Sequence, residues 1–373
     1  MNNKPSILDN YLNSPHDILF YINISLACNL YCKHCYISSK ESPVLDINAF
    51  LKWFDLYRKL VGNKKIKFVF FGGEPLLHIT KLLQIVERTK NENMFYDINT
   101  NLVCKLTEEL HAIIEYNNIN ILTSWDPISI RFKTQENFEL WKYNCKEIDR
   151  PKYFGITLLK EVLELDPRKL FEDILTWSSF DSIMSFQPLR SMLPLHSVAE
   201  LVMPKVKWES TLNLGSIPTW EEVDDWLCKA YDVKIPELTV ILFEEYINSC
   251  LSARQLCSDI SDTTISFTGN KFSVFPDGTI SSGYLAHPET FSTIYESPEK
   301  LKEFENLYVD KKYKSIVKNI RKKELFCRTC TLYQYCPDHR YPAIVTDACT
   351  FHKKLFKKIV KEYNPNILSQ LGY

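Results

Sequence analysis

Three cysteines near the amino terminus, Cys28, Cys32 and Cys35, are spaced C-x3-C-x2-C. Thiolates at such short intervals are typical ligands of an iron–sulfur cluster or of zinc. A cluster normally takes four thiolates, so three would leave one iron open to bind and activate another molecule. Zinc would need a fourth ligand nearby, for which His34 is the candidate. The spacing by itself leaves both centres open.

A second motif, Gly72, Gly73, Glu74 and Pro75, directly follows a run of residues that is typical of a buried β-strand. The glycines let the backbone approach a ligand closely, and Glu74 supplies a carboxylate. A glycine-rich turn alone is a weak signal. The position of the motif strengthens this signal, because the motif lies about forty residues, roughly one βα unit, after the cysteine triad.

The first half of the chain alternates β-rich runs with amphipathic stretches, which predicts a parallel sheet covered by helices. In such folds the chemistry collects at the carboxyl ends of the strands, and the cysteine triad follows the first strand. Six βα units predict an α/β fold with a partial (β/α)6 TIM-like barrel. The expected strands are Leu19–Ser25, Lys67–Phe71, Phe95–Asn99, Ile119–Ser124, Tyr153–Leu158 and Ser182–Pro188, and the expected helices are Ile47–Val61, Thr80–Thr89, Thr107–Tyr116, Asn137–Cys145 and Pro167–Trp177.

The periodic pattern loosens between residues 191 and 218, where several prolines occur, and the domain junction is expected there. We therefore divide the chain into an N-terminal segment, 1–17, a barrel, 18–215, and a smaller cysteine-rich α+β domain, 216–373. The last region contains a hairpin signal with Asp277 and Gly278 at its turn. It also carries a C-x2-C element and two further cysteines, a pattern typical of a metal site: Cys327, Cys330, Cys336 and Cys349.

The composition excludes several classes of protein. The 373 residues carry a net charge of −1, which does not favour a nucleic-acid or membrane partner. The basic segments 311–323 and 353–361 are interleaved with apolar residues at helical spacing and are interpreted as solvated helix faces. No apolar run has the length of a signal peptide or of a membrane span. Twelve cysteines without an export signal indicate metal ligation in a reducing cytoplasm.

The cysteine triad and the Gly-Gly-Glu-Pro turn together resemble the radical S-adenosylmethionine (SAM) superfamily. The resemblance implies that Cys28, Cys32 and Cys35 hold a 4Fe-4S cluster whose fourth iron binds SAM. The resemblance also implies which residues contact SAM: Gly72, Gly73 and Glu74 at the methionine amino group, Tyr36 near the adenine, Ser124 and Asp126 at the ribose, and Arg131 at the carboxylate. Thr100 and Asn101 match the family's Thr-Asn pair after the third strand, and Leu102 replaces the usual glycine there.

The C-terminal region resembles the SPASM extension, which carries auxiliary 4Fe-4S clusters after many radical SAM barrels. Two cysteines of that pattern are absent, because Gly283 and Arg340 stand at their positions. Both belong to the first auxiliary cluster of the family. The resemblance therefore implies one auxiliary 4Fe-4S cluster, held by Cys327, Cys330, Cys336 and Cys349. Cys250 and Cys257 are expected to be remnants of the lost site.

These features predict a cytoplasmic radical SAM enzyme that cleaves SAM and abstracts hydrogen from a substrate. The favoured substrate is a ribosomally made peptide that acquires a crosslink, a thioether or an epimerised residue. The alternatives are a dehydrogenase or epimerase of a sugar or aminoglycoside and, from another class, a non-catalytic iron–sulfur or zinc scaffold. An expected partner is an electron donor such as flavodoxin or ferredoxin. Because the barrel begins near Leu19, recognition of a leader peptide is expected to need either a separate recognition protein or direct docking to the barrel.

Overall fold

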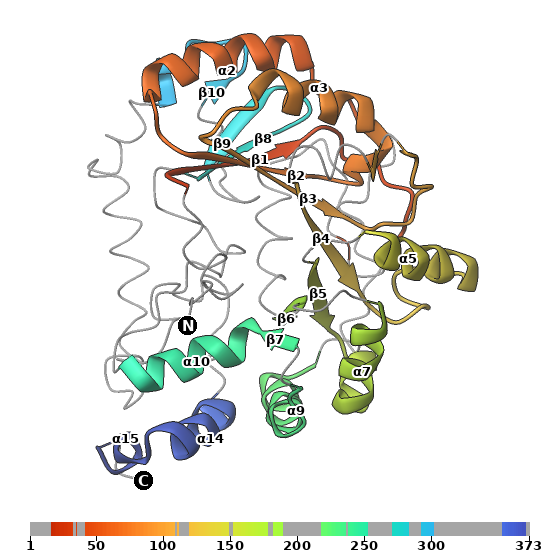
Figure 1. The fold of residues 1–373 in the computed structure, drawn as a ribbon, viewed down its shortest axis with the longest axis vertical. Helices are drawn as coiled ribbons and strands as arrows, with labels where there is room; N and C mark the ends of the chain where they lie inside the picture. The colour runs from red at the N-terminus through yellow and green to blue at the C-terminus, as the bar shows by residue number, and fades with distance from the viewer. Residues whose placement is uncertain are drawn as a thin grey trace, which may run out of the picture.

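The strands of the barrel form a single curved sheet in the computed structural model, with helices along its convex side (Figure 1). The structure describes residues 16–32, 35, 42–108, 110–111, 119–148, 152–177, 182–188, 218–235, 238–252, 271–282, 292–301 and 353–370. The strand order is β10-β9-β8-β1-β2-β3-β4-β5-β6-β7. Every pairing from β8 through β1 to β7 is parallel, whereas β9 and β10 pair antiparallel.

The six predicted strands are confirmed, with shifts of one or two residues at their ends. They are β1 (Ile18–Asn23), β2 (Ile66–Phe71), β3 (Met94–Thr100), β4 (Asn120–Trp125), β5 (Lys152–Leu158) and β6 (Ser182–Pro188). The helices on the convex side are α2 (Ile47–Val61), α3 (Ile79–Thr89), α5 (Gln135–Glu147), α6 (Lys160–Leu163), α7 (Pro167–Trp177) and α9 (Trp220–Asp232), with a short 3-10 turn at Pro75–His78. The helix expected at 107–116 lies largely outside the described residues.

The predicted ends of α2 show why the sequence folds this way locally. The Asp46 carboxylate accepts a hydrogen bond from the Ala49 amide at 3.0 Å, which caps the first turn. Gly62 ends the helix with a φ of 64°, a conformation that favours glycine. Between these ends, Phe50 and Phe54 pack on Phe68 of β2, with ring centroids 5.9 and 4.9 Å apart. This contact fixes the first βα unit, which carries the cysteine loop, against the second.

Strands from the C-terminal half extend the sheet at both edges, which the sequence pattern did not predict. The three-residue strand β7 (Leu238–Val240) pairs with β6 and leads into α10 (Ile241–Ser252). The hairpin of β8 (Lys271–Val274) and β9 (Thr279–Ser282) is confirmed, with Gly278 at φ 84°, and β8 pairs with β1. Strand β10 (Ser292–Thr293) completes this edge. The division at residue 215 and the SPASM-like domain stay predictions.

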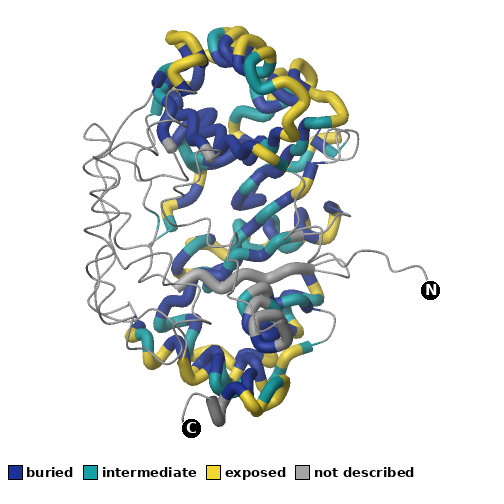
Figure 2. The backbone as a smooth tube through the Cα atoms, turned by 90° about the vertical axis from the view of Figure 1, so that its left-hand side faces the viewer, coloured by how far each residue is buried: buried dark blue, intermediate teal, exposed yellow. Residues whose placement is uncertain are grey.

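The C-terminal helices α14 (Lys353–Tyr363) and α15 (Pro365–Gln370) lie beside α9 and α10. Figure 2 shows that one side of these helices is exposed and that the strands of the sheet are largely buried. Asp224 of α9 accepts hydrogen bonds from the Lys354 and Leu355 amides at 2.8 and 3.0 Å, and so caps α14 from outside. Within the described residues, no helix combines the length and the apolar content that crossing a bilayer requires.

We expect Asp224→Ala to lower the free energy of unfolding by about 2 kcal/mol, because it leaves two amides of α14 without a partner. Urea denaturation followed by circular dichroism measures this loss. The neighbouring Asp225 is the matched control, since among the described residues its exposed carboxylate bonds to the Lys354 ammonium alone, at 2.7 Å. Asp225→Ala should have the smaller effect, because solvent screens such a pair. Equal losses in the two variants would contradict the capping role.

Candidate functional site

The cysteine triad lies at the carboxyl end of β1, as the sequence predicted. The side chains of Cys28, Cys32 and Cys35 are each partly exposed. The loop turns between the last two, where the Cys35 amide donates to the Cys32 carbonyl at 3.1 Å. The Leu30 amide points at the Cys28 sulfur, 3.4 Å away. The neighbouring His34 and Tyr36 lie outside the described residues.

The Gly-Gly-Glu-Pro turn follows β2 and is locked against the backbone that leads into the triad. The Gly73 amide donates to the Ser25 carbonyl at 3.0 Å, and the Glu74 amide donates to the Ala27 carbonyl at 2.9 Å. A Cβ on Gly73 would stand 2.0 Å from the Ala27 carbonyl oxygen, so this approach excludes any side chain. The two motifs recognised in the sequence therefore form one unit.

Glu74 joins this unit to the loop after β3. Its side chain is buried, and one carboxylate oxygen accepts from the Thr100 hydroxyl at 2.7 Å and from the Leu76 amide at 2.9 Å. The other oxygen accepts from the Asn101 amide at 2.7 Å. Burial raises the pKa of the Glu74 carboxyl, and these three donors oppose the rise. The direct contact of Glu74 with SAM stays a prediction, whereas its bonds hold two loops together.

The loop after β3 keeps a shape that favours glycine although Leu102 occupies the position. Leu102 has a φ of 53°, in the left-handed region, and its side chain is fully buried. That conformation costs a non-glycine residue about 1–2 kcal/mol, whereas burying a leucine side chain gains about 1.5–3 kcal/mol. Asn144 of α5 also clamps this loop, because its amide group donates to the Leu102 and Cys104 carbonyls, both at 2.7 Å.

The opposing effects of backbone strain and side-chain burial predict that glycine at position 102 is more stabilising than alanine. Leu102→Ala loses the buried side chain and keeps the strained φ, so we expect it to destabilise the protein by about 3 kcal/mol. Leu102→Gly loses the same contacts but relieves the strain, so its loss should be smaller by about 1 kcal/mol. Thermal or urea unfolding of the two variants gives the comparison. A glycine variant that is less stable than the alanine variant would contradict it.

The loop after β4 brings a buried ion pair to the other side of the cysteines. Ser124 is half-buried in β4, and Asp126 just beyond it is fully buried. The Asp126 carboxylate accepts from Arg131 Nε at 2.6 Å and from the Thr157 amide at 3.2 Å. These bonds fix the Arg131 guanidinium. Whether Ser124 and Asp126 bind ribose, and whether Arg131 binds a carboxylate, stay predictions.

Burial disfavours the thiolate form of these cysteines, and nearby donors and positive charges oppose that effect. Burial raises the pKa of Cys28 to about 11, while hydrogen bonds from the Leu30 amide and the Asn101 side chain lower it. Burial likewise raises the pKa of Cys32, and the charges of Arg131 and Lys133 oppose that rise. For Arg131, burial lowers the pKa, but Asp126 and the thiolates outweigh burial and raise it. The cation is therefore permanent and favours thiolates, the form that binds metal.

These residues fit an iron–sulfur cluster. Three thiols on one loop supply the donor set, and the glycine turn brings a second loop into backbone contact with it. Across the part of the chain that the structure describes, no three His, Cys, Asp or Glu side chains converge on a single ion. Cluster ligands need not converge so closely, because each thiolate binds a different iron. Cys327, Cys330, Cys336 and Cys349 lie outside the described residues, so the auxiliary site stays a prediction.

The sequence analysis did not identify the residues that support the site through hydrogen bonds from other parts of the chain. Asn144 and Thr157 support the site from α5 and β5, and Asn29 donates to the Val103 carbonyl. One signal was available, since Asn144 is a polar residue on the buried face of an amphipathic helix.

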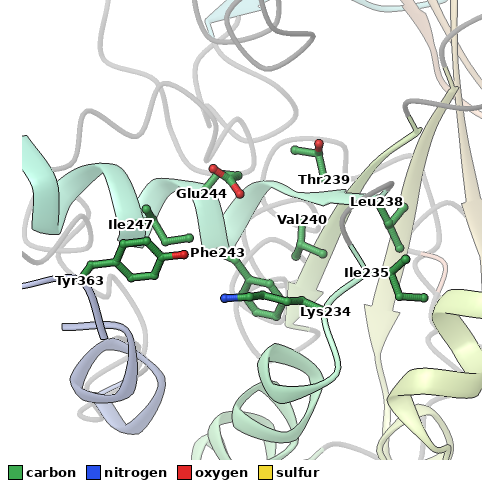
Figure 3. Close-up of a pocket in the computed structure, with 9 residues that line it drawn as sticks. All are labelled: Lys234, Ile235, Leu238, Thr239, Val240, Phe243, Glu244, Ile247 and Tyr363. Carbon is green, nitrogen blue, oxygen red and sulfur yellow. The ribbon is translucent and has the colours of Figure 1, made fainter. Parts of the chain in front are cut away.

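A separate pocket of about 300 Å³ lies beside β7, α10 and the end of α14 (Figure 3). Its lining is mainly apolar, with Lys234, Thr239, Glu244 and Tyr363 as the polar members. Burial raises the pKa of Glu244, and Lys234 opposes the rise. None of the predicted site residues lines this pocket.

The comparison with protein families favours the iron–sulfur cluster over the zinc site, the two metal centres that the spacing left open. Residues 22–171 match the model of the Radical SAM superfamily. This part of the chain is similar to a radical SAM domain. It begins within β1 and ends within α7, so it contains the triad, the glycine turn and the loops after β3 and β4. The family implies a 4Fe-4S cluster and SAM as cofactors.

One curated protein resembles part of the chain in sequence, and solved structures resemble most of the chain in fold at low sequence identity. An uncharacterized protein of Methanocaldococcus jannaschii, MJ0907, is 29% identical over 113 residues, which are 29% of this chain and 38% of that protein's length. A structure of anSMEcpe with bound AdoMet is 16% identical, with a TM-score of 0.59 over 95% of this chain and 99% of that one. Streptococcus suis SuiB bound to its precursor peptide SuiA is 13% identical, with a TM-score of 0.53 over 86% and 71%.

Proposed function

We propose that the protein is a radical SAM enzyme that modifies a ribosomally synthesised peptide by forming a crosslink or thioether or by epimerising a residue. The observation that carries the proposal is the locking of the Gly-Gly-Glu-Pro turn onto the cysteine loop through the Ser25 and Ala27 carbonyls. This arrangement presents three thiols and a glycine-lined backbone surface at one end of a parallel sheet, where ligands of such folds bind.

The chain's own residues have separate tasks in this proposal. Cys28, Cys32 and Cys35 would hold the cluster, and the backbone of Gly72 and Gly73 would contact the amino acid part of SAM. Arg131, fixed by Asp126, keeps a positive charge beside the cysteines. The bound cofactors supply the reductive cleavage of SAM to a 5′-deoxyadenosyl radical that abstracts hydrogen.

The structural neighbours support a peptide as the substrate class. SuiB was solved with the precursor peptide SuiA, and anSMEcpe was solved with AdoMet and the Cp18Cys peptide. Our proposal further includes one auxiliary 4Fe-4S cluster at Cys327, Cys330, Cys336 and Cys349, an electron donor such as flavodoxin or ferredoxin, and a cytoplasmic location.

Anaerobic reconstitution tests the proposal. Protein loaded with iron and sulfide should contain about eight irons per chain, four for each of two clusters, and should release 5′-deoxyadenosine from SAM after dithionite reduction. About four irons per chain, with 5′-deoxyadenosine formed, would contradict the auxiliary cluster but not the enzyme. About twelve would show that the first auxiliary cluster of the family is also present, although two of its cysteines are missing. Intact SAM in reduced, iron-loaded protein, or zinc at the triad, would refute the enzyme.

A further inference from the structure

Asn101 lies where the loops after β1, β2 and β3 meet, and its side chain and backbone amide are engaged in hydrogen bonds. Its side-chain amide group donates to the Cys28 sulfur at 3.6 Å and to Asn29 Oδ1 at 2.7 Å. Its backbone amide donates to Glu74 at 2.7 Å. We infer that Asn101 is a positioning residue that orients the Cys28 sulfur as a cluster ligand and raises the reduction potential of the bound cluster. This inference rests on the proposed function.

The orientation of the Asn101 side chain is determined by its other contact. Its carbonyl oxygen, Oδ1, accepts a hydrogen bond from the Val103 amide at 2.8 Å. A flipped side chain would place the amide nitrogen against that backbone N–H, donor against donor. The Asn101 side chain therefore presents its NH2 group, and not its oxygen, to Cys28.

The loop that carries Asn101 is held from two further sides. Asn144 clamps the Leu102 and Cys104 carbonyls from α5, and Asn29 donates to the Val103 carbonyl from the cysteine loop itself. Asn101 is 7% exposed, so water competes little for its hydrogen bonds. A donor held so firmly can fix the direction of the thiolate that it contacts.

Cys28 and Cys32 are stabilised by different means, which makes the role of Asn101 separable. Neutral donors, the Leu30 amide and the Asn101 side chain, surround the Cys28 sulfur. The charges of Arg131 and Lys133 act on Cys32 instead. Hydrogen bonds to cluster sulfurs withdraw electron density and stabilise the reduced cluster, so their removal lowers its reduction potential.

The test is a redox titration of iron-loaded, full-length protein followed by electron paramagnetic resonance. The signal that changes when SAM is added identifies the N-terminal cluster. Asn101→Ala should shift its midpoint to more negative potential, and Asn101→Asp should shift it further because a carboxylate repels the reduced cluster. Asn101→Gln keeps the amide donor and should recover part of the shift.

Asn91 provides a matched control at the opposite end of β3. Its Oδ1 also accepts from the amide two residues later, Asn93, at 2.9 Å, and its NH2 group donates to the Thr89 carbonyl at 3.0 Å. Asn91→Asp therefore makes the same amide-to-carboxylate change far from the cysteines, losing only the donor to the Thr89 carbonyl, and the midpoint potential should stay at the wild-type value.

Wild-type iron content together with a wild-type midpoint in Asn101→Ala would overturn the inference. If Asn101→Ala loses the N-terminal cluster while the Asn91 variant keeps it, Asn101→Gln decides: a restored cluster supports the positioning of Cys28, and its continued absence refutes it. Wild-type protein that binds no cluster would instead refute the proposed function, so the two failures are distinguishable.

Discussion

Cys32→Ala is expected to remove the N-terminal cluster and to lower the formation of 5′-deoxyadenosine more than about 100-fold. Loss of an outer partner of a metal ligand alone costs about 10–100-fold in metal affinity or activity, so loss of a ligand should cost more. Iron should fall from about eight to about four per chain, because the predicted auxiliary ligands remain. Iron analysis and chromatography of the SAM products measure the two effects.

Cys228 is the control for a general effect of removing a thiol. It lies half-exposed on α9 and is a free cysteine outside the candidate site. Cys228→Ala should retain wild-type iron and activity. If Cys32→Ala lost zinc in place of iron, the triad would be a zinc site and the radical chemistry would be excluded.

The fold could be predicted where the signals are local. Alternating β-rich and amphipathic runs located the six strands, and Asp46 and Gly62 marked the two ends of α2. β7 escaped prediction because three residues are too few to show a pattern. The pairing of β8 with β1 joins residues about 250 positions apart, and nothing in either local sequence specifies that partner.

In the candidate site, too, contiguous motifs could be predicted and contacts between distant residues could not. The spacing of the cysteines and the glycine turn could be recognised because each motif is contiguous. The roles of Asn101 and Asn144 arise only when separate loops meet, since their partners lie about 40 to 70 residues away. Leu102 is an intermediate case: the sequence identifies the departure from glycine, but only the buried side chain explains why the left-handed φ persists.

Gly73→Ala is expected to lower the free energy of unfolding by about 3–5 kcal/mol and to prevent loading of the N-terminal cluster. The new Cβ would stand 2.0 Å from the Ala27 carbonyl oxygen and 2.4 Å from that of Leu26, and neither backbone atom can rotate away as a side chain could. The two loops must separate, which breaks the hydrogen bonds of Gly73 and Glu74 to the cysteine loop. Urea denaturation and iron analysis measure the two losses.

Gly62→Ala separates this clash from the general cost of replacing a glycine. Gly62 has a φ of 64°, and a Cβ added there would meet nothing within 4 Å, so its replacement meets only backbone strain. We expect a loss of about 1 kcal/mol and unchanged iron content. If both variants lost the same stability and Gly73→Ala kept its iron, the close contact between the loops would not be required for the metal site. The coupling of the two motifs, on which the proposed chemistry depends, would then be wrong.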